Sequence, residues 1–307
     1  MQKVTGSNPV GPTIFKGMKT LQPIRTNFHT HTTWCDGKDS PENVIIAAIE
    51  KNFSAIGFSS HMAFPISNEW VIHPDKAIAY ASEVRALQKK YAGKIEIYLG
   101  CEADYLPGVT TPEYSRYKTI CPDYIIGSVH SVIGPGGKEM MVDFSPENLM
   151  EGIDSIFGGN VENFVKTYFR QQREMLKFDF DVLGHPDLLR KFNNSLHYID
   201  ESSLWYRREL EKTADAIAQS GKIVEVNTGA ISRGWMNEAY PSGRFRDMLR
   251  ERGVKFILNS DCHSADAIDC AFERFQDEED FLDFRQYLKE RVNAAERQEL
   301  FDCPAKT

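Results

Sequence analysis

Short apolar segments alternate along this chain with segments long enough to form helices. Seven of the apolar segments are candidate strands, at residues 25–31, 55–60, 95–101, 124–129, 180–183, 222–226 and 255–258. The predicted helices begin with one capped by Ser40 and continue at residues 75–91, 112–120, 161–178, 201–220 and 242–252. This alternation is typical of parallel β/α architecture. Because no linker rich in proline, glycine or serine interrupts it, we predict a single barrel-like α/β domain with its active site at the carboxyl ends of the strands.

Three stretches depart from this pattern. Residues 1–24 lack apolar periodicity and are expected to form a flexible N-terminal extension, which leaves residues 25–307 as the folded domain. Residues 131–160 form a long glycine-containing insertion directly after a predicted strand, where active-site loops sit in such folds. The tail after Ser264 looks helical, and its acidic run at residues 277–280 is expected to be a solvated helix start.

Histidines and carboxylates recur at the ends of the predicted strands. His29 and His31 close the first strand as H-x-H, a spacing that points both imidazoles to one face of an extended segment. Corresponding positions on later strands hold four more histidines and two carboxylates: His61, His130, His185, His263, Glu102 and Asp261. A third carboxylate, Asp36, follows H-x-H in the loop. Since the carboxyl ends of barrel strands converge on one rim, these side chains are predicted to surround one cavity and bind metal. Nitrogen and oxygen donors without thiolate suit zinc, iron or manganese.

Each histidine also has a more ordinary interpretation, because a single imidazole at a strand end is more often a satisfied polar residue than a metal ligand. Six of the eight histidines stand at corresponding strand ends, which random placement would rarely produce, and this favours the metal site. His73 and His197 fall in loops or before helices and are predicted to be surface residues.

Three cysteines neighbour predicted ligands, which raises the question of a thiol nucleophile. Cys101 and Cys262 stand at alternate positions to the neighbouring ligands, so strand geometry turns them away from the rim. Cys35 is better placed than either. We nevertheless predict that no thiol acts as the nucleophile.

The charge balance narrows the class of partner. The chain of 307 residues has 36 Lys and Arg against 44 Asp and Glu, a net charge of −8, which opposes a surface that binds nucleic acid through counterion release. Its six cysteines contain no C-x-x-C pair, and no segment is long and apolar enough for export or membrane insertion. We therefore predict a cytoplasmic enzyme, monomeric or homodimeric, with a small-molecule substrate and neither nucleic-acid nor membrane partners.

The order of the motifs along the chain resembles the PHP family, the polymerase and histidinol phosphatase superfamily of metal-dependent phosphoesterases. The similarity covers about residues 25–265 and includes NFHTHTTWCDG, GSVHS with its long insertion, GHPDLLRKF, EVNTGAISRG and NSDCHS. It implies a distorted (β/α)7 barrel, which agrees with the seven strands counted from the pattern. The motifs are most similar to those of the histidinol-phosphate phosphatase branch, in which an aspartate, here Asp36, replaces the histidine of other branches.

The resemblance implies three divalent transition metal ions, of zinc, iron or manganese. Their ligands would be His29, His31, Glu102 and Asp261 for the first, Glu102, His130 and His185 for the second, and Asp36, His61 and His263 for the third. The implied reaction is hydrolysis of L-histidinol phosphate to L-histidinol and phosphate, a step of histidine biosynthesis. It would proceed by in-line attack of a metal-bridging hydroxide, with no phosphoenzyme.

Side chains at the rim are candidates for roles beyond metal binding. Asp261 could orient the nucleophile or pass a proton to the leaving alcohol, and His263 and His61 are weaker candidates for that proton transfer. Arg233 is predicted to clamp the phosphate, because a guanidinium matches phosphate oxygens bidentately. Arg190 and Lys38 are secondary substrate-binding candidates, and each of the three cations could instead be a solvent-exposed charge.

Other functions stay open at this point. The substrate could be another small phosphomonoester, a nucleotide or a nucleic acid end, although the acidic surface opposes a polymer. An amidohydrolase-type deaminase also begins with H-x-H on a barrel strand, but the final D-x-H and the GHPD histidine oppose it. A metal-storing or regulatory member with a decayed site would lack ligands, whereas every ligand position is filled here.

Overall fold

A nearly closed ring of parallel strands organises the protein. The computed structural model describes residues 25–66, 68–276, 278 and 281–293, so the predicted N-terminal extension lies outside the described residues. The main sheet has the order β1-β2-β4-β5-β8-β9-β10, with β3 paired beside β4 and with parallel pairing throughout. The bounds are β1 Thr26–Asn27, β2 Ala55–Phe58, β3 His61–Met62, β4 Glu96–Asp104, β5 Tyr124–Ser128, β8 Val182–Leu183, β9 Ile223–Asn227 and β10 Phe256–Asn259. The predicted α/β barrel of seven strands is confirmed.

The first strand, β1, is joined to the last strand, β10, mainly by side-chain hydrogen bonds. A single parallel bridge links Thr30, after β1, to Cys262, after β10. The Asn259 side-chain carbonyl accepts a hydrogen bond from the Phe28 amide at 2.9 Å. Asn27 accepts from the Ser260 amide at 3.2 Å and donates to the Ser260 hydroxyl at 2.6 Å. These asparagines supply the hydrogen bonds that a full strand ladder would otherwise provide.

The interior of the barrel is a packed core rather than a channel. Tyr124 lies within it and donates its hydroxyl proton to the Phe28 carbonyl oxygen at 2.6 Å. Gly100 makes room for that ring, because a Cβ atom there would lie 2.4 Å from Tyr124 Cζ. Phe284, at the start of helix α9 (Phe284–Asn293), packs edge-on against Phe28 with ring centroids 4.8 Å apart. Helix α9 therefore closes the amino end of the barrel and leaves the carboxyl end for the site.

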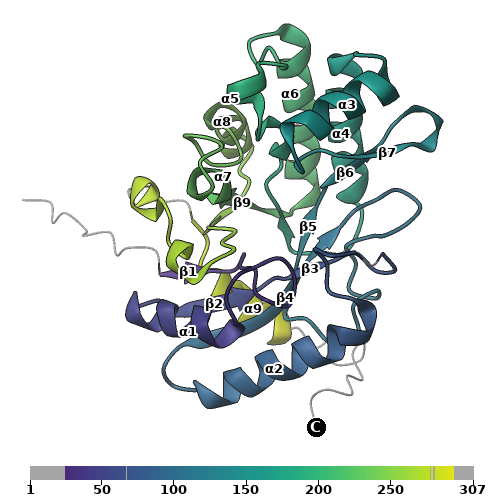
Figure 1. The fold of residues 1–307 in the computed structure, drawn as a ribbon. Coiled ribbons are helices and arrows are strands. Elements are labelled where there is room, and N and C mark those ends of the chain that lie inside the picture. The colour runs from purple at the N-terminus through teal and green to yellow at the C-terminus, as the bar shows by residue number, and fades with distance from the viewer. Residues whose placement is uncertain (1–24, 67, 277, 279–280, 294–307) are drawn as a thin grey trace, which may run out of the picture.

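Helices surround the strands (Figure 1). The longer ones are α1 Pro41–Glu50, α2 Ala77–Lys90, α3 Pro146–Phe157, α4 Val161–Met175, α6 Leu204–Ser220 and α8 Gly243–Glu251, and the four-residue ones are α5 Asn193–Leu196 and α7 Gly229–Ser232. Side-chain capping explains where helix α1 begins. The Ser40 hydroxyl accepts a hydrogen bond from the Asn43 amide at 3.3 Å, and Pro41 occupies the first turn. Among the described residues, no helix is long and apolar enough to cross a membrane.

The insertion at residues 131–160 is more regular than a loop. It begins with an antiparallel hairpin of β6 (Ser131–Ile133) and β7 (Glu139–Met141), joined by a 3-10 turn at Pro135–Gly137. Helix α3 follows and is capped by Ser145, whose hydroxyl accepts from the Asn148 amide at 3.1 Å. The hairpin is fastened to helix α4, since Gln171 accepts from the Ile133 amide at 2.7 Å. Figure 1 shows the hairpin beside α4 and α3.

Two local predictions are wrong in detail. Residues 112–120 form consecutive turns rather than a helix. Their backbone hydrogen bonds link residues three apart, from the Tyr117 amide to the Tyr114 carbonyl and from the Ile120 amide to the Tyr117 carbonyl. Tyr114, Tyr117 and Ile120 recur at this spacing, and all three are buried. The tail after Ser264 begins with short 3-10 turns, and α9 starts only at Phe284. Most of the acidic run, residues 277, 279 and 280, lies outside the described residues.

Candidate metal centre

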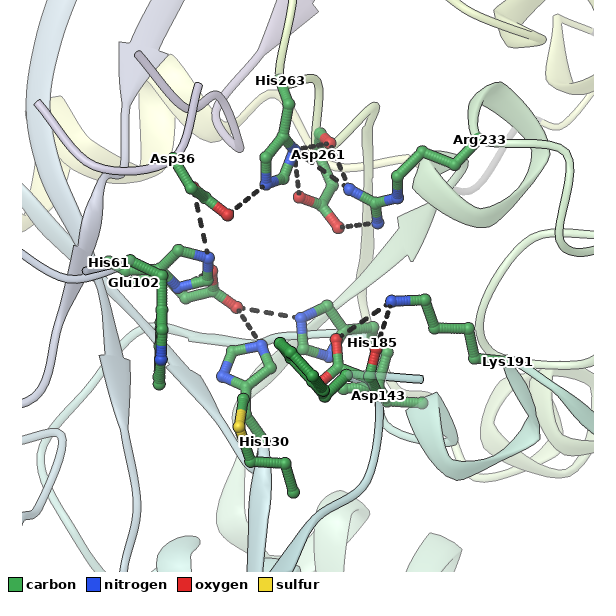
Figure 2. A pocket seen from close by; sticks show the side chains of 14 residues that line it. Asp36, His61, Glu102, His130, Asp143, His185, Lys191, Arg233, Asp261 and His263 are labelled. Atoms are coloured by element: carbon green, nitrogen blue, oxygen red, sulfur yellow. Dashed lines mark hydrogen bonds and ion pairs between the residues drawn. The ribbon is translucent and has the colours of Figure 1, made fainter. Parts of the chain in front are cut away.

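The predicted metal ligands meet at the carboxyl end of the barrel. They lie on strands β3 and β4 or follow strands β1, β5, β8 and β10, and they are His29, His31, Asp36, His61, Glu102, His130, His185, Asp261 and His263. Figure 2 shows the labelled members converging on one cavity. The tertiary structure therefore brings together residues that are spread over more than two thirds of the chain.

Glu102 stands at the middle of the group with its two oxygens facing different histidines. Oε2 lies 3.1 Å from His29 Nε2 and 3.0 Å from His61 Nδ1. Oε1 lies 2.9 Å from His185 Nε2 and 3.4 Å from His130 Nε2. A carboxylate whose two oxygens face different pairs of imidazoles can bridge two metal ions.

Asp36 and Asp261 border the same group on the side away from His185. Asp261 Oδ1 lies 3.2 Å from His31 Nε2, and its backbone adopts a φ of 48°, a left-handed conformation uncommon outside glycine and enriched at functional sites. Asp36 Oδ2 lies 3.2 Å from His263 Nε2, and its Oδ1 lies 3.9 Å from His61 Nε2. The two aspartates thus extend the centre beyond Glu102.

Buried polar atoms without partners test whether metal ions fit here. His29 Nε2, His31 Nε2, His61 Nδ1 and Glu102 Oε2 are buried, and none makes a hydrogen bond to a described residue. Such atoms are costly when left unpaired, whereas imidazole nitrogens and carboxylate oxygens bind divalent ions directly. The donor atoms fall into four overlapping groups, each within 4.8 Å: His31, Asp36, His61 and His263; His29, His31 and Asp261; His29, Glu102 and His185; His61, Glu102 and His130. The residues present fit transition-metal ions.

The electrostatics favour the metal-binding forms of the carboxylates. Burial raises the pKa of Glu102, but His29 and His61 outweigh that effect and hold its pKa well below the usual range. Burial likewise opposes ionisation of Asp261, and the charges of Arg233 and His29 keep its pKa well below the usual range. Both carboxylates are therefore anionic at neutral pH, the state that binds metal ions.

A cavity of about 300 Å³ lies over the centre. Besides the ligands, its walls include Trp70, Met141, Asp143, Phe144, Leu188, Lys191 and Arg233. The Lys191 ammonium donates to the Asp143 backbone oxygen at 2.7 Å and to Asp143 Oδ2 at 3.2 Å. Burial raises the pKa of Asp143, but Lys191 and His130 outweigh it, so the pKa is lowered. Asp143 comes from the insertion that the sequence predicted to be an active-site loop.

Arg233 lies in the cavity wall beside the predicted ligands. Its Nη2 donates to Asp261 Oδ2 at 3.1 Å, and its Nη1 lies 3.0 Å from His263 Nδ1 (Figure 2). Gly229 permits this approach, because a Cβ atom there would lie 2.8 Å from both Arg233 Nη2 and Asp261 Oδ2. The guanidinium therefore borders the centre and is fixed in place.

The other two predicted substrate contacts lie elsewhere. Arg190 is buried outside the cavity lining, where it donates to Glu201 Oε2 at 2.9 Å and pairs with Glu238 and Asp187. Lys38 is exposed and is not among the residues that line the cavity. Their roles in substrate binding stay predictions, and the described cavity presents Lys191 and Arg233 as its cations.

Comparison with known proteins places this architecture in a family. The PHP domain profile matches residues 27–229. This chain belongs to the PHP domain family. Its PHP domain is similar to a Deinococcus radiodurans protein named "Probable histidinol-phosphatase", with 30% identity over 241 residues that cover 76% of this chain and 85% of the relative.

Two solved structures share the PHP fold. A candidate histidinol phosphatase, HisK, from Listeria monocytogenes has a TM-score of 0.72 at 23% identity, covering 81% of this chain and 99% of that one. Histidinol phosphate phosphatase from Lactococcus lactis, solved with zinc, L-histidinol and phosphate, has a TM-score of 0.63 at 18% identity, covering 87% and 93%. At these identities the likeness shows the fold.

Two carboxylates beneath the PHP centre escaped the sequence analysis. Asp104 Oδ1 lies 2.6 Å from His130 Nδ1, and Glu225 Oε2 lies 2.8 Å from His29 Nδ1. A signal for Glu225 exists, because it is a charged residue flanked by apolar residues inside a buried strand, whereas Asp104 is the last residue of β4. Asp104 also stands two residues after Glu102, on the same face of β4.

The two other histidines lie away from the PHP centre, whereas the Cys35 sulfur lies 3.5 Å from His31 Nδ1. His73 and His197 are exposed, as predicted. Burial raises the pKa of the Cys262 thiol to about 12 and, together with the Asp36 charge, that of Cys35 to about 11. Cys101 is fully buried. Thiols held in the protonated form are poor nucleophiles, and the absence of a thiol nucleophile stays a prediction.

Proposed function

We propose that this PHP domain is a metal-dependent phosphatase that hydrolyses L-histidinol phosphate to L-histidinol and phosphate, a step of histidine biosynthesis. The observation that carries the proposal is the convergence of histidine and carboxylate donors around Glu102, with Arg233 in the adjoining cavity wall. The name of the D. radiodurans relative and the L-histidinol and phosphate in the L. lactis structure support this choice of substrate.

Three divalent transition metal ions, of zinc, iron or manganese, are the proposed cofactors. The ligand sets proposed from the resemblance are His29, His31, Glu102 and Asp261; Glu102, His130 and His185; and Asp36, His61 and His263. The donor atoms group differently in part, since His31 also lies with Asp36, His61 and His263, and Glu102 lies in one group with His29 and His185 and in another with His61 and His130. When bound, such ions neutralise phosphoryl oxygens and lower the pKa of water toward neutrality. The zinc in the L. lactis structure supports zinc among these three elements.

The chain's own side chains would hold the phosphate and move the proton. Arg233 is proposed to donate both arms of its guanidinium to phosphoryl oxygens, a match that its planar geometry favours. Asp261 has one oxygen held by Arg233 and the other facing the centre, so it is the proposed residue to orient the attacking water or pass a proton to the leaving alcohol. His263, at the exposed edge, is the second candidate for that transfer.

The part of the cavity wall that holds Asp143 suits the far end of the proposed substrate. L-histidinol phosphate carries an ammonium group close to the phosphate, followed by an imidazole. Asp143 Oδ2 is bonded to Lys191, whereas its Oδ1 receives no hydrogen bond from a described residue and can accept one from an ammonium group. Trp70 and Phe144, which is 70% exposed, present aromatic faces at the same cavity.

Replacing Asp143 with asparagine is therefore expected to raise KM for L-histidinol phosphate by roughly 10–100-fold, the effect of losing a charged hydrogen bond. Hydrolysis of p-nitrophenyl phosphate, which has no ammonium group, should change little. Steady-state kinetics on both substrates measure the difference. The control is Asp154→Asn, an exposed aspartate on helix α3 of the same insertion. Equal losses on the two substrates would show that Asp143 does not recognise the amine.

The function itself is tested by metal content and substrate preference. The purified protein is expected to contain transition metals and to release phosphate from L-histidinol phosphate faster than from p-nitrophenyl phosphate, a nucleoside monophosphate or a dinucleotide diester. Chelation should remove the activity, and zinc or manganese should restore it. A preference for the nucleotide or the diester would replace the substrate with the alternative considered from the sequence. Activity that survives complete metal removal would exclude the mechanism.

The cytoplasmic location and the monomeric or homodimeric state stay predictions. The acidic balance of 36 basic against 44 acidic residues supports a small substrate over a nucleic acid polymer.

A further inference from the structure

Glu225 is a buried carboxylate beneath the metal centre with no part in the proposed reaction. It is the middle residue of β9 and is fully buried. Its Oε2 and Oε1 lie 2.8 Å and 3.1 Å from Nδ1 of His29. The other nitrogen of that ring, Nε2, faces Glu102 Oε2 at 3.1 Å and makes no hydrogen bond. A single imidazole therefore stands between Glu225 and the metal centre.

Three other N–H groups converge on the same carboxylate. The His185 backbone amide and the Asn227 side-chain amide donate to Oε1 at 2.9 Å and 2.8 Å. The Asn259 side-chain amide donates to Oε2 at 2.9 Å. Because every one of these neighbours is a donor, the site around Glu225 requires acceptors at both oxygen positions.

We propose that Glu225 is a positioning residue that keeps the proton of His29 on Nδ1 and so leaves the lone pair of Nε2 free for a metal ion. The inference rests on the metal-dependent function proposed above. A carboxylate that accepts from the second nitrogen of a ligating histidine fixes both the tautomer and the orientation of the ring. The bond from the His185 amide extends the effect, because the same carboxylate also holds the backbone of a second ligand.

Replacing Glu225 with glutamine tests the idea with little change in volume. The amide nitrogen of the new side chain would face His29 and Asn259, or else His185 and Asn227, and in either orientation a donor would meet donors. His29 could relieve the conflict by accepting at Nδ1. That change would move its proton to Nε2, where it blocks metal binding.

The readout is the affinity of the metal-free protein for zinc, measured by competition with a chromogenic chelator. We expect Glu225→Gln to bind at least one ion 10–100-fold more weakly than the wild type. Glu225→Asp retains two acceptor oxygens and should recover part of the affinity. The matched control is Glu209→Gln, which alters another buried carboxylate on helix α6, outside the cavity and bonded to Arg173 and Lys212. It should lower the melting temperature without changing zinc affinity.

Nitrogen-15 NMR of the zinc-loaded wild type provides a second measurement that does not depend on a variant folding. The His29 ring should show a slowly exchanging proton on Nδ1. A ring proton found instead on Nε2, or a Glu225→Gln variant that binds zinc as tightly as the wild type, would overturn the positioning role. If the wild type itself binds no metal ion, the proposed function fails together with the inference. If the wild type and Glu225→Gln bind zinc equally tightly, only the role of Glu225 is refuted.

Discussion

The Glu102→Gln variant is expected to lose activity by a factor on the order of 10³ and to retain fewer metal ions. Glu102 has one oxygen facing His29 and His61 and the other facing His130 and His185. An amide keeps the size of the side chain but has only one oxygen, so it cannot bridge two ions. Metal analysis of the purified variant and phosphate release from L-histidinol phosphate measure the two effects.

Thermal melting provides a third measurement on the same variant. A ligand that binds only the folded state stabilises it by about 2.7 kcal/mol at 100 times its Kd, so added zinc should raise the melting temperature of the metal-free wild type. Glu102→Gln should lose most of that increase. Glu96→Gln is the control, because Glu96 begins the same strand but is 41% exposed and paired with Lys289. A Glu102→Gln protein with full metal content and full activity would contradict the assignment of the centre.

The Arg233→Ala variant is expected to lower kcat/KM by about 10²–10³-fold, or about 2.7–4 kcal/mol, the effect of removing one preorganised donor to a developing charge. Since Arg233 is proposed to hold the phosphate, the loss should be equal for L-histidinol phosphate and p-nitrophenyl phosphate. Asp143→Asn should affect only the former. Arg233→Lys keeps the charge without the planar fork and should recover only part of the activity.

The metal content of Arg233→Ala separates a phosphate contact from a structural effect on Asp261, to which Arg233 donates. We expect the content to match the wild type. Arg207→Ala is the control for a lost positive charge, because Arg207 is exposed on helix α6 and pairs with Glu211. Loss of metal ions together with activity would show that Arg233 supports the ligand rather than the substrate.

Much of the barrel was predictable from local pattern. Strands buried on both faces read as short apolar runs, and segments such as residues 124–128 and 256–259 are buried throughout. The failure at residues 112–120 has a physical cause, since Tyr114, Tyr117 and Ile120 bury through turns at a spacing that a helix would also allow. The hairpin at residues 131–141 was also missed, because its support comes from α4, which is distant in sequence.

The site was likewise predictable where its signal is local in the sequence, and not where it depends on contacts between distant segments. The ligands stand at strand ends, and a parallel barrel brings those ends together whatever the intervening sequence. Arg190 and Lys191 show the limit of such reasoning. They are adjacent in sequence, yet Arg190 is enclosed by Asp187, Glu201 and Glu238 whereas Lys191 reaches the cavity and Asp143. Which of two neighbouring cations faces the cavity depends on partners in other segments.

The sequence by itself determined the seven barrel strands, most of the helices between them and the nine candidate ligands, because burial on both faces and position at a strand end are local properties. Tertiary structure alone decided that Glu102 divides its oxygens between two pairs of histidines, that Glu225 lies behind His29, and that Asp143 and Lys191 form the cavity wall. The physical reason is that these contacts join residues 28 to 196 positions apart in the sequence, and their geometry is set by the packing of the whole barrel.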